Sequence, residues 1–120
     1  MKKAVYTLCV LLCATALLGQ ATSNKEITVR GEVLDQHCFV IIQHGSGPDH
    51  AGCSNACMSR NVSIGFLAED GQFYALLGET LVSIKEKVEK MAGKRAALKG
   101  FLESRGGLKD IRMTSIEFAQ

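Results

Sequence analysis

The chain has 120 residues, with 14 basic and 12 acidic side chains, one proline and no tryptophan. A chain of this length forms one domain with a modest hydrophobic core. The formal net charge of +2 leaves no clear excess of basic side chains to follow nucleic-acid phosphates, so no nucleic-acid partner is expected.

The N-terminal segment has the order of a secretory signal peptide. Two lysines precede an uncharged, largely apolar run over residues 4–19, and small or polar residues follow it. The apolar run is short for a membrane span, so no stable membrane anchor is expected after cleavage. We therefore predict that residues 1–23 are a signal peptide, cleaved after about Ala21 or Ser23, and that residues 24–120 form a single domain, periplasmic or secreted.

Cleavage changes both the charge and the cysteine count. Lys2, Lys3, Cys9 and Cys13 leave with the signal peptide, so the exported chain carries 12 basic and 12 acidic residues. Three cysteines remain: Cys38, Cys53 and Cys57. Three is an odd number for an oxidising compartment, so at least one cysteine is free, intermolecular or bound to a metal.

The first part of the domain has the alternation of β-strands. Apolar residues alternate with polar ones over residues 27–33, which predicts a half-buried strand. Gly31 falls on its inward side, where a missing side chain permits a sharp bend or a close crossing by another strand. Residues 63–68 and 73–77 are two further apolar runs, and the turn signal at residues 69–72 predicts a hairpin between them.

The second part contains one helix and two strands. Ser83 and Glu86 have the spacing of a capping box, and one helical face carries Ile84, Val88 and Met91. We expect this helix to end at Gly93.

Two strand-like runs follow, over residues 95–102 and 108–118. In the second run the apolar phase slips between Met113 and Ile116, which predicts a β-bulge or the end of pairing.

This order of elements resembles the OB-fold, a small five-stranded barrel. The segments that carry the resemblance are Val29-Arg-Gly-Glu-Val-Leu-Asp35, Ala92-Gly-Lys-Arg95 leading into Leu98-Lys-Gly-Phe101, and Gly106-Gly-Leu-Lys-Asp-Ile111 ending in Ser115-Ile-Glu117. Together they resemble the small exported bacterial proteins of OB-fold type. The resemblance implies a mainly β domain of five strands, with the helix between strands three and four. The chain departs from a minimal barrel in an insert between strands one and two. OB-folds commonly hold oligonucleotides or oligosaccharides, but a fold alone does not transfer function.

The insert contains the residues most suited to chemistry. Residues 45–49 have the composition of a loop, and Asp49 is the expected N-cap of a helix beginning at His50. In an α-helix over residues 50–60, rotation of about 100° per residue places His50, Cys53 and Cys57 on one face.

Cys38, at the far end of the first strand, is able to approach that face. Three thiolates and one imidazole form the ligand set of structural zinc, so we predict a metal site at Cys38, His50, Cys53 and Cys57, with copper as the second candidate metal. Asp35 is expected to cap a turn or to orient a ligand histidine through a hydrogen bond. His37 and His44 are possible ligands in place of His50.

A structural disulfide is the alternative at this cluster. Cys38 paired with Cys53 or Cys57 would hold the insert against the first strand and contribute about 3 kcal/mol of stability. A bond between Cys53 and Cys57 is disfavoured, because Cβ atoms four residues apart on a helix lie about 5–6 Å apart. The disulfide leaves one thiol unpaired.

Three functions are compatible with these features. The first is an exported binding or accessory module that holds zinc or copper. The second is a barrel that binds an oligosaccharide or a peptide and whose insert is structural, and the third is an exported thiol redox protein. No nucleophile elbow, phosphate loop or Ser/His/Asp spacing is present, so we expect no enzyme activity.

Overall fold

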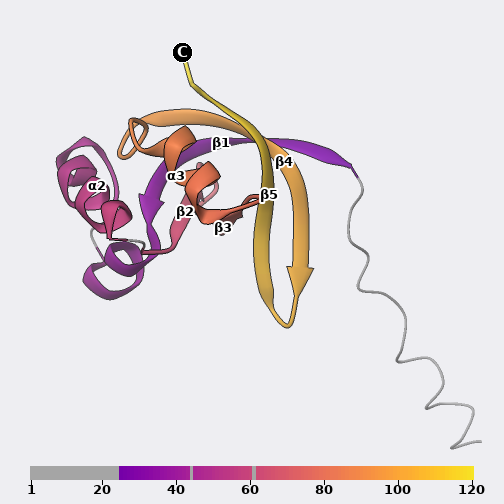
Figure 1. The fold of residues 1–120 in the computed structure, drawn as a ribbon, viewed down its shortest axis with the longest axis horizontal. Helices are drawn as coiled ribbons and strands as arrows, with labels where there is room; N and C mark the ends of the chain where they lie inside the picture. Colours follow the sequence, from indigo (N-terminus) through magenta and orange to yellow (C-terminus); the bar gives the residue numbers. More distant parts are fainter. Residues whose placement is uncertain (1–24, 44, 61) are drawn as a thin grey trace, which may run out of the picture.

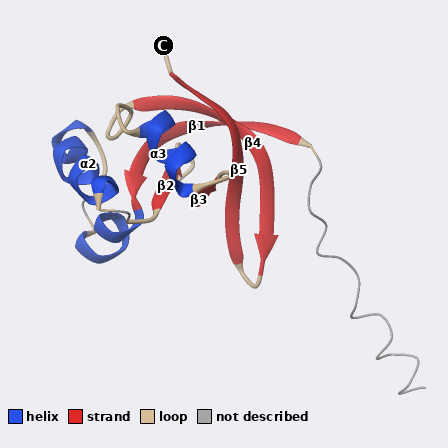
Figure 2. Ribbon diagram, in the orientation of Figure 1, coloured by secondary structure: helices blue, strands red, loops and turns tan. Residues whose placement is uncertain are grey.

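The computed structural model describes residues 25–43, 45–60 and 62–120, and this part of the chain is mainly β structure (Figures 1 and 2). Its strands are β1 (Glu26–Asp35), β2 (Ile64–Ala68), β3 (Phe73–Leu77), β4 (Arg95–Arg105) and β5 (Leu108–Phe118). Its helical segments are the π-helical turn η1 (Cys38–Ile42), the 3-10 turn η2 (Pro48–His50), α2 (Ala51–Ser59) and α3 (Leu81–Val88). The predicted signal peptide lies outside the described residues.

All the described strands belong to one sheet whose pairing closes into a ring. The order is β1-β2-β3-β5-β4, and β4 pairs with β1 again. The β3–β5 pair is parallel and the others are antiparallel. Each described strand is therefore hydrogen-bonded to a neighbouring strand along both of its edges.

Gly31 is where β1 changes partners, as its predicted role requires. It pairs with Ala68 of β2 and with Ala96 of β4. A Cβ atom at this position would lie 2.0 Å from the carbonyl oxygen of Leu67 and 2.8 Å from the Phe66 ring. Only glycine permits this close approach of β2, which confirms the predicted crossing.

The predicted hairpins and bulge are confirmed with small changes of boundary. The turn after Ala68 joins β2 to β3, while β4 extends to Arg105, three residues past its predicted end. Lys99 pairs with Ser115 but Gly100 pairs with Met113, so one residue of β5 is left without a partner in the ladder. This is a β-bulge at the place where the apolar phase slips.

The predicted N-cap of α3 was wrong: the cap lies three residues earlier than Ser83, about one helical turn. Thr80 is the N-cap: its hydroxyl accepts a hydrogen bond from the Ser83 amide at 3.1 Å, and the Ser83 hydroxyl accepts one from the Thr80 amide at 3.3 Å. Ser83 therefore closes the capping box from its third position instead of opening it, because a serine hydroxyl makes the same return bond as glutamate. The predicted end at Gly93 is wrong, because α3 ends at Val88. Ile84 and Val88 are buried on the predicted inner face of the helix, and Met91 is buried in the turn that follows it.

The core fills the ring of strands and extends to the insert. Its most deeply buried side chains come from several strands and from both α-helices: Val33, Met58, Phe66, Val88, Leu98 and Ile111. Met58 is the contribution of α2, and it ties the insert to the core. No helix in the described part of the chain is long and apolar enough to cross a bilayer.

Candidate metal centre

The insert between β1 and β2 brings two helical segments together at one end of the sheet. Figure 1 shows η1 and α2 side by side, away from the hairpin that joins β4 to β5. Cys38 is the first residue of η1, three positions after Asp35 ends β1, and α2 carries Cys53 and Cys57. The predicted location of the insert and its partly helical character are both observed.

The start of α2 differs from the prediction. Pro48 begins a 3-10 turn that runs to His50, and α2 follows at Ala51 with His50 as its N-cap and no side-chain cap bond. Asp49 therefore lies inside the 3-10 turn, and its predicted N-cap role is wrong. The physical reason is local: Gly47, with φ +82°, redirects the chain, and the proline ring favours the first position of a helical turn.

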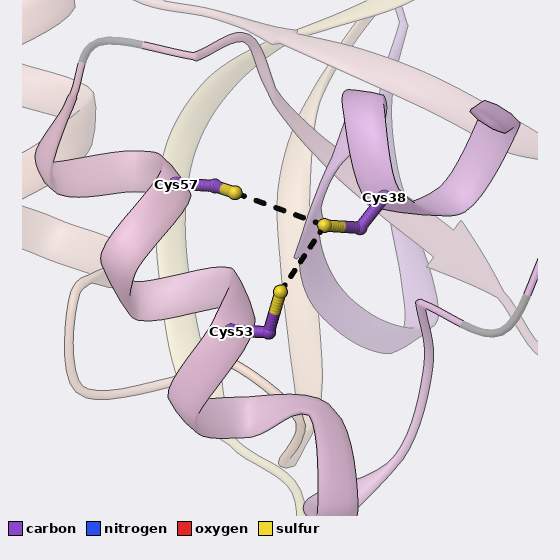
Figure 3. A group of neighbouring side chains, drawn as sticks. All are labelled: Cys38, Cys53 and Cys57. Atoms are coloured by element: carbon purple, nitrogen blue, oxygen red, sulfur yellow. Dashed lines mark hydrogen bonds between the residues drawn. The ribbon is translucent and has the colours of Figure 1, made fainter. Parts of the chain in front are cut away.

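Three sulfur atoms meet between these elements (Figure 3). The Sγ atom of Cys38 lies 3.3 Å from that of Cys53 and 3.7 Å from that of Cys57. All three sulfurs are within 4.8 Å of one another. In Figure 3 both cysteines of α2 point toward Cys38, so the cluster joins residues from two elements.

These separations fit a common metal ion. Zinc binds thiolates at about 2.3 Å in a tetrahedron, which places two sulfur ligands roughly 3.8 Å apart. Both sulfur–sulfur distances to Cys38 lie below that value, by at most about half an ångström. The donor set and its spacing therefore suit zinc or another thiolate-binding ion.

Asp35 lies beneath the cluster and is hydrogen-bonded to both elements that carry the cysteines. It is the last residue of β1, and its side chain is fully buried. One carboxylate oxygen accepts a hydrogen bond from the Cys38 amide at 2.7 Å, and the other accepts one from the Ser54 hydroxyl at 3.2 Å. Asp35 thus caps the entry into η1 and also binds α2, which holds both cysteine-bearing elements against the sheet.

Further contacts fix the position of α2. Ser54 and Met58, four residues apart, are both buried, so this face of the helix packs inward. Before the 3-10 turn that leads into α2, the Gly47 amide donates a 2.8 Å hydrogen bond to the Glu32 carboxylate of β1. Gly93 approaches so closely that an added Cβ would lie 2.7 Å from the Gly47 carbonyl oxygen.

The environment favours protonated thiols while no cation is bound. The Cys53 thiol and then burial raise the pKa of Cys38 above the ordinary thiol value, and Cys57 and Asp35 add to the shift. Burial is the main cause that raises the pKa of Cys57. A bound cation reverses this balance, because a coordinating thiol is deprotonated.

The predicted histidine ligands are not part of the observed cluster. Among the described residues, the group of mutually close ligand atoms contains the three cysteines and not His50. His50 belongs to the 3-10 turn, so the α-helical rotation that placed it beside Cys53 does not apply to it. His37 precedes η1 and is exposed, and His44 lies outside the described residues. A ligand role for His50 stays a prediction.

No disulfide joins the cysteines of the described chain. Cys38, Cys53 and Cys57 are all free thiols. The nearest sulfur pair, at 3.3 Å, is well beyond the disulfide bond length of about 2.05 Å.

One member of the site was missed from the sequence. Ser54 lies next to Cys53, and its hydroxyl reaches Asp35 across 19 positions of sequence. Ser54 is buried, and a buried hydroxyl needs a hydrogen-bond partner. In the sequence, the available signal was only its position directly after Cys53, a candidate ligand.

Comparison with protein-family models, with curated proteins and with solved structures finds no match for this chain.

Proposed function

We propose that the protein is a small exported module that binds one transition-metal ion through Cys38, Cys53 and Cys57. The observation that carries the proposal is the meeting of three sulfur atoms, from η1 and α2, within 4.8 Å of one another. Side chains of these two elements converge only because buried contacts to Asp35 and to the core hold them there.

Zinc is the first candidate ion and Cu(I) the second. Thiolates bind both ions well. Three thiolates and the buried carboxylate of Asp35 bring four negative charges into one small region, and a divalent ion offsets more of that charge than a monovalent one. Cys38, Cys53 and Cys57 would hold the ion, and a tetrahedral ion would need one further donor, such as water or a side chain.

The domain that carries the site is proposed to be OB-like. The support is the chain order, in which α3 falls between β3 and β4, together with a ring of five described strands and a bend glycine in β1. Export is proposed from the basic, apolar and small-residue order of residues 1–23.

Metal analysis of the reduced protein tests the proposal. We expect one zinc or copper ion per chain after purification without chelator, together with three cysteines that are all alkylatable after denaturation and chelation. The variants C38S, C53S and C57S each remove one sulfur ligand and should lose the ion. Asn55→Ala, an exposed change on the same helix, should retain it.

Two results would refute the metal site. The first is a wild-type chain that takes up no zinc or Cu(I) under reducing conditions. The second is equal metal content in the wild type and in all three cysteine variants.

A further inference from the structure

The three cysteines of the cluster differ in their exposure to solvent. Cys38 is 2% exposed, Cys57 is half-buried and Cys53 is exposed. A reagent dissolved in water therefore meets Cys53 first, and the Sγ atom of Cys38 lies 3.3 Å from that of Cys53 (Figure 3). One accessible thiol with a second thiol within reach is the arrangement of an attacking and a resolving cysteine.

Cys38 and Cys53 are the pair best placed to form a disulfide. From 3.3 Å, their sulfurs need to approach by only about 1.2 Å to reach bonding distance. Cys57 lies farther from Cys38, at 3.7 Å. Cys53 and Cys57 lie four positions apart on α2, where Cβ atoms are separated by about 5–6 Å, beyond the roughly 3.5–4.5 Å of a disulfide.

We infer that the cluster is a redox-controlled metal site, in which disulfide exchange at Cys53 leads to release of the ion. This inference rests on the metal-binding function proposed above. The oxidant is an organic disulfide. The Cys53 sulfur attacks one sulfur of that reagent, the reagent's S–S bond breaks, and its other half leaves as a thiolate that takes up a proton.

The second step forms the internal bond. The Cys38 sulfur attacks the Cys53 sulfur of the mixed disulfide, and the remaining half of the reagent leaves as a second thiol. In total, two cysteines lose two electrons and one organic disulfide becomes two thiols. The two protons of those thiols come from the cysteines or, where the ion has already displaced them, from solvent.

Loss of metal follows from the ligand count. The internal bond removes two of the three sulfur ligands and leaves Cys57, which alone does not retain the ion. Reduction of the bond restores all three thiols, so the process is reversible. Cys53 is thus a site of thiol modification as well as a ligand.

Glutathione disulfide is the probe for the thiol chemistry. The zinc-loaded full chain is treated without air, quenched at intervals and mapped by mass spectrometry. We expect a glutathione adduct on Cys53 that forms first and then disappears as a Cys38–Cys53 bond forms, while Cys57 stays alkylatable. A first adduct on Cys38 or Cys57, or a final bond that includes Cys57, overturns the inference.

Matched variants separate the two thiol roles when each is compared with the reduced, metal-free wild type, because each variant loses the ion. C38S should leave the adduct on Cys53 unresolved. C53S changes an exposed position, so it preserves the fold, and it should slow adduct formation by about tenfold or more because the remaining thiols are less accessible. C57S should form the same Cys38–Cys53 bond as the wild type. Unchanged adduct formation in C53S contradicts the inference.

A zinc-release measurement distinguishes the two proposals. A chromophoric chelator reports free zinc during the same reaction, and release in step with the Cys38–Cys53 bond supports redox control. If the bond forms while zinc stays bound, the metal site stands and the redox control is refuted. If the chain holds no zinc at the start, the proposed function itself is refuted.

Discussion

The buried carboxylate of Asp35 accepts a 2.7 Å hydrogen bond from the backbone amide of Cys38, and this contact attaches the first cysteine of the cluster to the end of β1. The second oxygen of the same carboxylate holds Ser54 of α2. One side chain thus sets the distance between the two elements that carry the sulfurs.

Replacing Asp35 is expected to loosen the cluster. D35A leaves the buried Cys38 amide and Ser54 hydroxyl without an acceptor, which should lower the free energy of unfolding by about 2–4 kcal/mol and weaken zinc binding. D35N keeps an acceptor oxygen and similar shape, so it should lose less stability. Urea denaturation and chelator competition measure the two effects. Equal stability of D35A and the wild type would contradict this role of the carboxylate.

Ser54 provides a narrower test of the same contact. S54A removes the bond to Asp35 and leaves one carboxylate oxygen without its partner, at an expected loss of about 1–2 kcal/mol. Ser59 is the control on the same helix: it is exposed and its hydroxyl bonds only to the Ala56 carbonyl oxygen, so S59A should change stability by less than about 0.5 kcal/mol. Similar losses in both variants would assign the effect to helix propensity instead.

Two glycine substitutions are expected to act in opposite directions. G31A places a Cβ 2.0 Å from the Leu67 carbonyl oxygen, so β1 and β2 must separate and stability should fall by about 2–3 kcal/mol or more. G52A meets open space on α2 and should stabilise by up to about 1 kcal/mol, because alanine favours the helix. Thermal unfolding of both variants checks the signs, and a G31A chain as stable as the wild type would show that β2 is not so close.

The raised thiol pKa values predict the pH dependence of metal binding. Because the pKa values of Cys38 and Cys57 lie above the ordinary 9.0, these thiols are protonated at neutral pH and the ion must displace their protons. Zinc affinity should therefore fall as pH decreases, and binding near pH 7 should release about two protons from Cys38 and Cys57. Calorimetry in buffers of different ionisation enthalpy counts them. Release of fewer than about two protons would contradict the thiol ligands.

The metal-free chain has the opposite trend with pH. A raised pKa in the folded state means that the protonated thiols contribute stability below pH 9.0, where the unfolded thiols are also protonated. That contribution is lost as pH rises above this value. Denaturation of the chelated protein should show lower stability at alkaline pH, and the decline should be smaller in a chain in which Cys38 and Cys57 are both replaced by alanine.

His50 is expected to be unnecessary for zinc binding by the three cysteines. Because His50 lies outside the observed group, H50A should still bind one zinc ion, with an affinity within a few-fold of the wild type. Competition with a chelator of known affinity measures this. A loss of about tenfold or more would instead identify the imidazole as the fourth ligand, as its sequence position suggests.

Local patterns in the sequence predict the strands, the bulge in β5 and the inner face of α3, because alternation and helical rotation depend on near neighbours alone. The same rotation correctly groups Cys53 with Cys57, which lie within one continuous α-helix. It fails for His50, because the chain changes to a 3-10 turn at Pro48. The cap of α3 was misplaced because a serine can occupy either end of a capping box.

The sequence by itself determined that Cys53 and Cys57 share a helix face. Only the tertiary structure decided that Cys38 joins them, that Ser54 belongs to the site and that Cys53 is the accessible sulfur. These facts depend on where η1 and α2 lie after β1 ends, and that position is set by Asp35 and Met58 through contacts between residues far apart in the chain. Local periodicity carries no information about such contacts, which form only when the core closes around them.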